Sequence, residues 1–132
     1  MACPHFLRPL VEGSAEGLIL KAEGSNRPLA TTLEPALDSA TRRRGLLGRE
    51  GLPEGTALII APSNAVHTFF MRFPIDLIFA ARDGRVLKLR HGVPARRMSG
   101  SLRAHAVIEM AAGSIERAGL RVDDRLVVVG RH

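Results

Sequence analysis

Short runs of apolar residues, separated by turn-forming residues, recur along the whole chain. Runs of about four to eight residues bounded by glycine, proline, asparagine or aspartate are typical of β-strands. We predict strands at residues 18–20, 29–37, 56–61, 77–81, 86–90, 104–110 and 126–129. The 67–79 segment is expected to form two strands broken at Pro74. Because Pro35 has no backbone N–H to donate, the 29–37 strand is expected at a sheet edge or a bulge.

The clearest local prediction is a β-hairpin over residues 77–90. The pair Asp83 and Gly84 separates its two apolar runs, and this pair is typical of a type I′ turn. On the second strand, leucines alternate with Lys88 and Arg90. A period of two predicts a half-buried strand with a solvated basic face.

Two short helices are predicted between the strands. The side chain of Asp38 can cap a first turn, and Gly48 can adopt the left-handed conformation that ends a helix, so residues 39–47 are expected to be helical. Gly45 inside this helix costs about 1 kcal/mol relative to alanine, so a local packing or bending reason for it is expected. The second helix, residues 113–119, has one or two turns.

The order of these elements predicts a mainly β fold. Many short strands with two short helices are typical of a single-domain β-sandwich or barrel, here over residues 17–132. Residues 1–16 contain two prolines and little periodicity, so a loose N-terminal arm is expected. A chain of 132 residues, of which 45% are hydrophobic, suffices for one domain with a real core.

Cysteine content and hydropathy exclude several classes of protein. Cys3 is the one cysteine in the sequence, which rules out an intramolecular disulfide framework and a zinc site of several thiolates. The first 20 residues lack the continuous apolar stretch of a signal peptide, and no run is long enough to span a membrane. We therefore expect a cytoplasmic location and no membrane partner.

The segment from His67 to Phe79 is the most informative part of the sequence. It contains four of the five phenylalanines, together with Arg72 and Asp76. Burying ionisable groups in an apolar run is costly unless each finds a partner. We therefore expect this segment to lie at the centre of the fold and to contribute to a site.

Several motifs, taken in order, resemble one known family. They are Thr41–Arg49, Leu52-Pro53, His67–Phe79, Asp83–Val86, Ile108–Gly113 and Val122–Asp124. The set resembles the bacterial and archaeal family called domain of unknown function 192, over roughly residues 29–129. The resemblance implies a jelly-roll-like β-sandwich with short helices, and it implies no reaction.

Two positions depart from the family pattern. Members often carry tryptophan before the methionine of the central motif and Asn-Thr after it, where this chain has Phe70 and Arg72-Phe73. The late turn of the family is usually Gly-Asp, whereas this chain has Asp123-Asp124. Asp123 is therefore expected to take over the positive φ that the glycine serves.

Ionisable residues within the apolar strands suggest a binding cleft. We predict that it holds a small anionic ligand or a protein segment, close to the central motif. The candidate ligand-binding residues are Arg42, His67, Thr68, Met71, Arg72, Asp76 and Glu109.

Other readings of the same residues stay open. In a hydrolase- or lyase-like enzyme, His67 would act as a base with Asp76 or Glu109, although no nucleophile lies in a recognisable motif. In a purely structural reading, His67 pins two strands and Asp76 accepts backbone amides. Glu109, in the middle of a strand, faces either solvent or a pocket.

The net charge of +6 allows a nucleic-acid partner without favouring one. The excess is concentrated in residues 82–103, where a hairpin and loop could track phosphates through Arg85, Lys88, Arg90, Arg96 and Arg97. The chain has no tryptophan or tyrosine for base stacking. The five histidines show no close-spaced pair, so no metal site and no cofactor are predicted.

Overall fold

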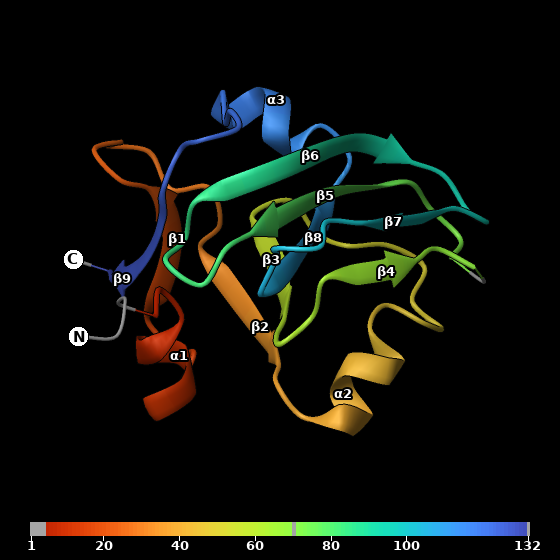
Figure 1. Cartoon of the computed structure of the whole chain (residues 1–132), viewed down its shortest axis with the longest axis horizontal. Helices are drawn as coiled ribbons and strands as arrows, with labels where there is room; N and C mark the ends of the chain where they lie inside the picture. The colour runs from red at the N-terminus through yellow and green to blue at the C-terminus, as the bar shows by residue number, and fades with distance from the viewer. Residues whose placement is uncertain (1–4, 70, 132) are drawn as a thin grey trace.

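The computed structural model describes residues 5–69 and 71–131. The strands are β1 (Leu18–Ala22), β2 (Thr32–Ala36), β3 (Thr56–Ile60), β4 (Ala65–His67), β5 (Ile75–Ala80), β6 (Val86–Val93), β7 (Met98–Gly100), β8 (Ala106–Ala111) and β9 (Leu126–Gly130) (Figure 1). The helices are α1 (Arg8–Glu12), α2 (Ser39–Arg44) and α3 (Ser114–Ala118). The fold is therefore mainly β, as the sequence predicts.

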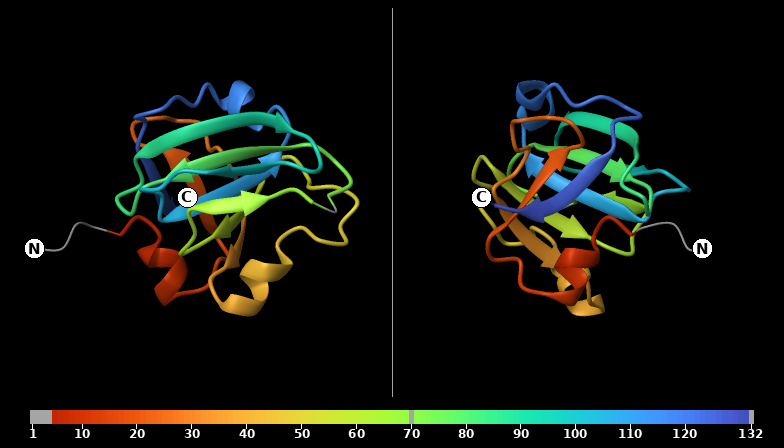
Figure 2. Two further views of the ribbon diagram at one scale, coloured as in Figure 1. Left: turned by 45° about the vertical axis from the view of Figure 1, so that its right-hand side comes forward. Right: turned by 90° about the vertical axis from the view of Figure 1, so that its left-hand side faces the viewer.

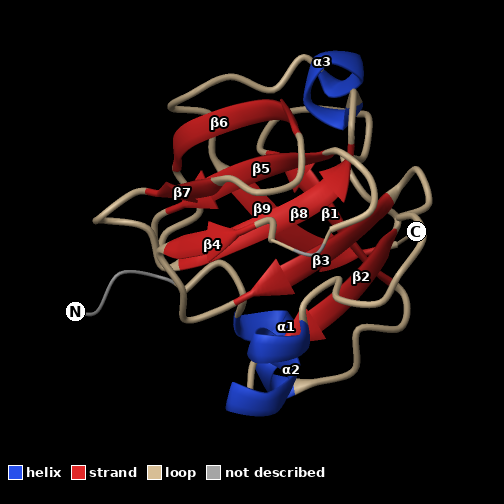
Figure 3. Cartoon of the chain, turned by 90° about the vertical axis from the view of Figure 1, so that its right-hand side faces the viewer, coloured by secondary structure: helices blue, strands red, loops and turns tan. Residues whose placement is uncertain are grey.

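A five-stranded sheet in the order β2-β3-β8-β5-β6 forms the middle of the molecule. Strands β2 and β3 pair in parallel, and the other neighbours are antiparallel. Pro35 lies on β2, at the edge where a missing donor is tolerated. The two-stranded sheet β1-β9 covers one face and is seen in front of it in the right view of Figure 2. The two-stranded sheet β4-β7 covers the other face, with α2 beside it (Figure 3).

Alternation along the central strands divides the core in two. Ile78 and Ile108 are paired in register and pack in the core beneath β1-β9. Leu77 and Phe79 point the other way and pack with Val66 of β4. Every residue of β3, β5 and β8 is buried except the last of β8, which explains why these strands appear as continuous apolar runs in the sequence.

The N-terminal segment differs from the loose arm expected for residues 1–16. From residue 5 onward it is ordered against the body of the protein: Phe6, Leu7 and Leu10 are buried in the main core. Pro9 stands in the first turn of α1, where its missing N–H costs nothing. The described part of the chain therefore has three short helices rather than two, and none of them is long and apolar enough to cross a membrane.

Helix α2 begins as predicted and ends earlier than predicted. The Thr41 N–H donates to Asp38 Oδ1 at 2.8 Å. The Asp38 backbone N–H donates to Thr41 Oγ1 at 3.4 Å, which completes a capping box. Gly45 has a φ of +47° and terminates the helix, so the prediction that the helix continues to residue 47 is wrong. The unfavourable glycine inside the predicted helix is in fact its end.

The predicted β5-β6 hairpin is present, but its turn is of another type. A type I′ turn needs positive φ at both Asp83 and Gly84, and here only Gly84 has it, at +95°. The Gly84 N–H donates to Ala81 O at 2.9 Å, closing a longer turn. Asp123, by contrast, adopts the positive φ expected of it, +79°.

Candidate functional site

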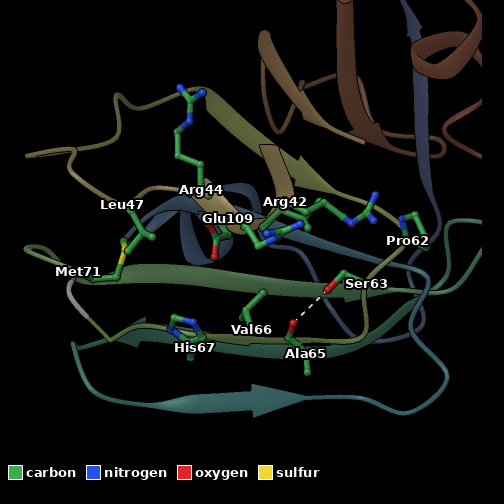
Figure 4. A pocket seen from close by; sticks show the side chains of 13 residues that line it. Arg42, Arg44, Leu47, Pro62, Ser63, Ala65, Val66, His67, Met71 and Glu109 are labelled. Carbon is green, nitrogen blue, oxygen red and sulfur yellow. Dashed lines mark hydrogen bonds between the residues drawn. The ribbon is translucent and has the colours of Figure 1, made fainter. Parts of the chain in front are cut away.

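A pocket of about 270 Å³ opens between α2 and β4, above the central sheet. Its lining residues come from the end of α2 and the loop after it, from β3 and the loop into β4, from β4 itself, and from β8. They are Arg42, Arg43, Arg44, Gly45, Leu47, Ile60, Pro62, Ser63, Ala65, Val66, His67, Met71 and Glu109. In Figure 4 the Glu109 side chain lies in the middle of this set, with the arginines on one side and Val66 and His67 on the other.

Glu109 forms the floor of the pocket. It lies on β8 between its register partners Leu58 of β3 and Leu77 of β5, so apolar side chains flank it on both sides. The residue is only 5% exposed, and its Oε1 atom has no hydrogen-bond partner among the described residues. Burial raises the pKa of the Glu109 carboxyl to about 7, although the positive charge of Arg49 opposes this shift.

The mouth of the pocket carries the three consecutive arginines of α2. Arg42 is half-buried, and its guanidinium donates to Leu37 O at 2.8 Å and to Ala61 O at 3.4 Å. Arg43 and Arg44 are exposed, and neither forms an ion pair within the described part of the chain. The exposed side chains of Arg43 and Arg44 thus remain available on the solvent side.

His67 and Met71 complete the side of the pocket opposite α2. His67 ends β4 and is exposed, with its ring 5.4 Å from that of Phe69. Met71 is half-buried and packs against the core of this face. Four of the predicted ligand-binding residues, Arg42, His67, Met71 and Glu109, therefore line one pocket.

The other predicted ligand-binding residues lie elsewhere, and each has a structural contact. The Thr68 hydroxyl is buried and donates to Pro94 O at 2.6 Å. Arg72 is exposed and forms an ion pair with Glu50 at 3.7 Å. Both side chains are absent from the set that lines the pocket.

Asp76 serves as a backbone acceptor, which was one of its two predicted roles. Its Oδ1 accepts the Gly92 N–H at 2.8 Å and its Oδ2 accepts the Ile115 N–H at 2.9 Å. Its register partner is Met110, which packs in the core beneath β1-β9. Asp76 and Glu109 therefore lie on opposite faces of the sheet, and the predicted pairing of His67 with Asp76 is wrong.

The basic hairpin is less solvated than the alternation of β6 suggests. Lys88 and Arg90 are half-buried beneath β7, where Lys88 Nζ donates to Gly100 O at 2.9 Å and Arg90 donates to Ser99 Oγ at 3.3 Å. Arg85 pairs with Asp123 at 3.3 Å. Arg96 and Arg97 are exposed. The prediction that the basic face of β6 is solvated is therefore wrong.

Sequence reasoning missed Arg43 and Arg44 as lining residues, although the triple arginine is a visible signal. It also missed the apolar walls, Leu47, Ile60 and Val66, because nothing local distinguishes a wall from a core position. Among residues 5–69 and 71–131, no three histidine, cysteine or acidic side chains are grouped as metal ligands would be.

Comparison with known proteins shows which family and which fold this chain resembles. A family model described as "DUF192: Uncharacterized ACR" matches residues 19–128. A crystal structure from Sinorhizobium meliloti 1021, of a candidate transcription regulator, has a TM-score of 0.72 and 22% identity, covering 83% of this chain and 89% of that one. A second, a protein of unknown function from Novosphingobium aromaticivorans DSM 12444, has a TM-score of 0.71 and 21% identity, covering 83% and 81%. At these identities the likeness shows the fold alone. No curated protein matches the chain.

Proposed function

Because the chain belongs to DUF192, a family described as uncharacterised, we propose its function from the pocket geometry: it is a binding domain for a small anionic molecule. The ligand occupies the pocket between α2 and β4, with its negative charge at the arginine mouth. A volume of about 270 Å³ lies near the lower end of ordinary ligand sites, which suits a compact metabolite rather than a large cofactor.

The observation that carries this proposal is the carboxyl of Glu109 on the pocket floor. A polar atom buried without a partner costs about 1–3 kcal/mol, so a site that contains one is a candidate for ligand contact. The pocket adds apolar walls and a few converging polar groups, which is the usual composition of a small-molecule site.

The charge at the mouth supports an anion over a neutral ligand. Arg42, Arg43 and Arg44 are consecutive, and at neutral pH the one carboxyl among the lining residues, that of Glu109, is only partly ionised because its pKa is about 7. Guanidinium groups bind carboxylates and phosphates through paired hydrogen bonds. The local field therefore attracts anions.

A thermal-shift screen of small carboxylates and phosphates tests the proposal. A ligand of the folded protein raises the melting temperature by mass action. We expect a hit to stabilise the wild type and the Arg121→Ala control, which removes an exposed arginine remote from the pocket, but not the Arg43→Ala/Arg44→Ala double variant. Equal stabilisation of all three proteins, or no hit of either class at millimolar concentration, would contradict the proposal.

Acid–base catalysis by Glu109 is a second candidate, favoured by its pKa. A carboxyl with a pKa of about 7 can gain and lose a proton at neutral pH, as a general acid or base must, and His67 lines the same pocket. Turnover of chromogenic esters that is lost in Glu109→Gln and kept in Glu116→Gln, an exposed control on α3, would support this role. Equal turnover in both variants would exclude it.

A further inference from the structure

The floor of the pocket lies beside the backbone that carries the arginines. The end of α2 lies against Glu109: a Cβ atom at Gly45 would be 4.0 Å from Glu109 Oε1. Arg44 immediately precedes Gly45, and Arg43 precedes Arg44. The backbone that carries Arg43 and Arg44 therefore lies next to the carboxyl on the pocket floor.

Within residues 5–69 and 71–131 no group donates to Glu109 Oε1, and two arginines near the pocket are committed elsewhere. Arg42 donates to the carbonyls of Leu37 and Ala61. Arg49, whose charge acts on Glu109, forms a two-pronged pair with Glu34 at 2.7 and 3.2 Å. The Glu109 carboxyl, which lines the pocket, is therefore left with capacity to accept a hydrogen bond from a ligand.

The walls between floor and mouth are largely apolar. In Figure 4 Leu47 and Val66 stand on different sides of the Glu109 side chain, and Ile60 and Met71 also line the pocket. An apolar group on the ligand would remove this surface from water, which is favourable by roughly 25 cal/mol per Å². The site thus combines an acceptor, an apolar wall and a cationic mouth.

We infer that the ligand is a small zwitterion, an amino acid with an apolar side chain, whose ammonium group donates to Glu109 and whose carboxylate binds Arg43 and Arg44. This inference rests on the proposed anion-binding function and specifies the second group that the anion carries. Binding gives the buried carboxyl a donor and offsets one of the two positive charges of the exposed arginines.

Isothermal titration calorimetry with three matched probes tests the inference. The probes are L-leucine, 4-methylpentanoate, which lacks the amine, and 3-methylbutylamine, which lacks the carboxylate. We expect leucine to bind at least about tenfold more tightly than either analogue, because a buried group built to accept a hydrogen bond discriminates strongly against ligands without the donor.

Two variants assign the groups of the ligand to the groups of the pocket. Glu109→Gln should weaken leucine binding about tenfold and leave 4-methylpentanoate binding nearly unchanged, since only the ammonium loses its charged partner. Arg43→Ala/Arg44→Ala should weaken both carboxylates. Glu116→Gln and Arg121→Ala, both remote from the pocket, should bind like the wild type.

The protons exchanged on binding provide an independent readout. Near pH 7 an ammonium beside Glu109 favours the ionised carboxylate, so leucine should release up to about half a proton per site, whereas a lone carboxylate ligand would take protons up. The heat of binding in buffers of different ionisation enthalpy measures this number. Loss of the release in Glu109→Gln is expected.

The possible failures are distinguishable. If 4-methylpentanoate binds as tightly as leucine, or if leucine takes up protons, the zwitterion inference is wrong while the anion site stands. If 3-methylbutylamine alone binds, or if none of the three probes and no other small anion binds, the proposed function and this inference both fail.

Discussion

Asp76 and Glu109 are both buried carboxylates on neighbouring strands, yet their surroundings differ completely. Asp76 accepts two backbone N–H groups, from Gly92 and Ile115, and so ties β6 and the start of α3 to the sheet. Glu109 Oε1 accepts none within the described residues, and the Glu109 residue lines a pocket. The first carboxylate is part of the framework, and the second is available for chemistry or binding.

The raised pKa of Glu109 makes the stability of the fold dependent on pH. Between the ordinary pKa of 4.5 and the folded value of about 7, the unfolded chain has lost the proton that the folded chain keeps. The free energy of unfolding therefore falls as pH rises through this window, by up to about 3 kcal/mol. Glu109→Gln, which resembles the protonated form, removes the contribution of Glu109 to this dependence.

Urea denaturation of the wild type and Glu109→Gln, at about pH 5 and about pH 8, measures this effect. We expect the variant to gain stability relative to the wild type as the pH is raised. Glu116→Gln, at an exposed site, should show no such gain. A difference between wild type and Glu109→Gln that stays constant between the two pH values would show that the carboxyl is not desolvated.

The sequence indicates Glu109 as a residue of interest, but it does not show toward which face of the sheet the Glu109 side chain points. A glutamate between Ile108 and Met110 faces away from both, whichever side of the sheet that is. Only the covering elements, α2 and β4, decide that its face holds a pocket. The same limit applies to the predicted placement of Asp76 beside His67. The two residues belong to one continuous segment, but His67 lies on β4 and Asp76 on β5, which is part of another sheet.

At the scale of elements, features set by neighbouring residues could be predicted from the sequence. The pairing of strands that are distant in sequence could not. The capping box of α2 and the β5-β6 hairpin follow from neighbouring residues, and both are present. Lys88 and Arg90 do share one face of β6, but β7 covers that face and accepts their hydrogen bonds. Which strand covers a face is set by contacts distant in sequence.

The turn of the β5-β6 hairpin depends on a glycine for two reasons. Gly84 has a φ of +95°, and a Cβ there would collide with the carbonyl oxygen of Leu126. Gly84→Ala should therefore destabilise the fold by more than about 3 kcal/mol, through strain and displacement of β9. Gly24→Ala is the matched control, with a φ of +83° and open space around its Cβ, and should cost about 1 kcal/mol.

Chemical denaturation of both alanine variants separates backbone strain from the close approach. A clearly larger loss at position 84 is expected. Equal losses at the two positions would mean that β9 does not pack against this turn.

At the scale of the whole molecule, the β-sandwich could be predicted and the role of the N-terminus could not. The number and spacing of short strands suggest a sandwich, and the family resemblance agrees with the match over residues 19–128. The segment before β1 lacks periodicity because only one turn and a half of helix forms there. Its burial comes from three side chains, Phe6, Leu7 and Leu10, that reach the common core.

Two substitutions in the N-terminal segment measure its contribution to the free energy of unfolding. Leu7, which precedes α1, is fully buried, so Leu7→Ala should lower the free energy of unfolding by about 2–5 kcal/mol. Val11 on the same segment is 58% exposed, and Val11→Ala should change it by less than about 0.5 kcal/mol. Equal, small effects in urea denaturation would mean that the segment is the loose arm expected from sequence.

The most direct test of the proposed site is the titration of Glu109 itself, followed through its side-chain carboxyl carbon by NMR, with Glu109→Gln to assign the signal. A buried carboxyl on the floor of an arginine-rimmed pocket should titrate with a midpoint near pH 7, as its pKa of about 7 requires. A midpoint at the ordinary glutamate value of 4.5 would show that Glu109 is solvated or paired, and the pocket would lose the group on which both proposals rest.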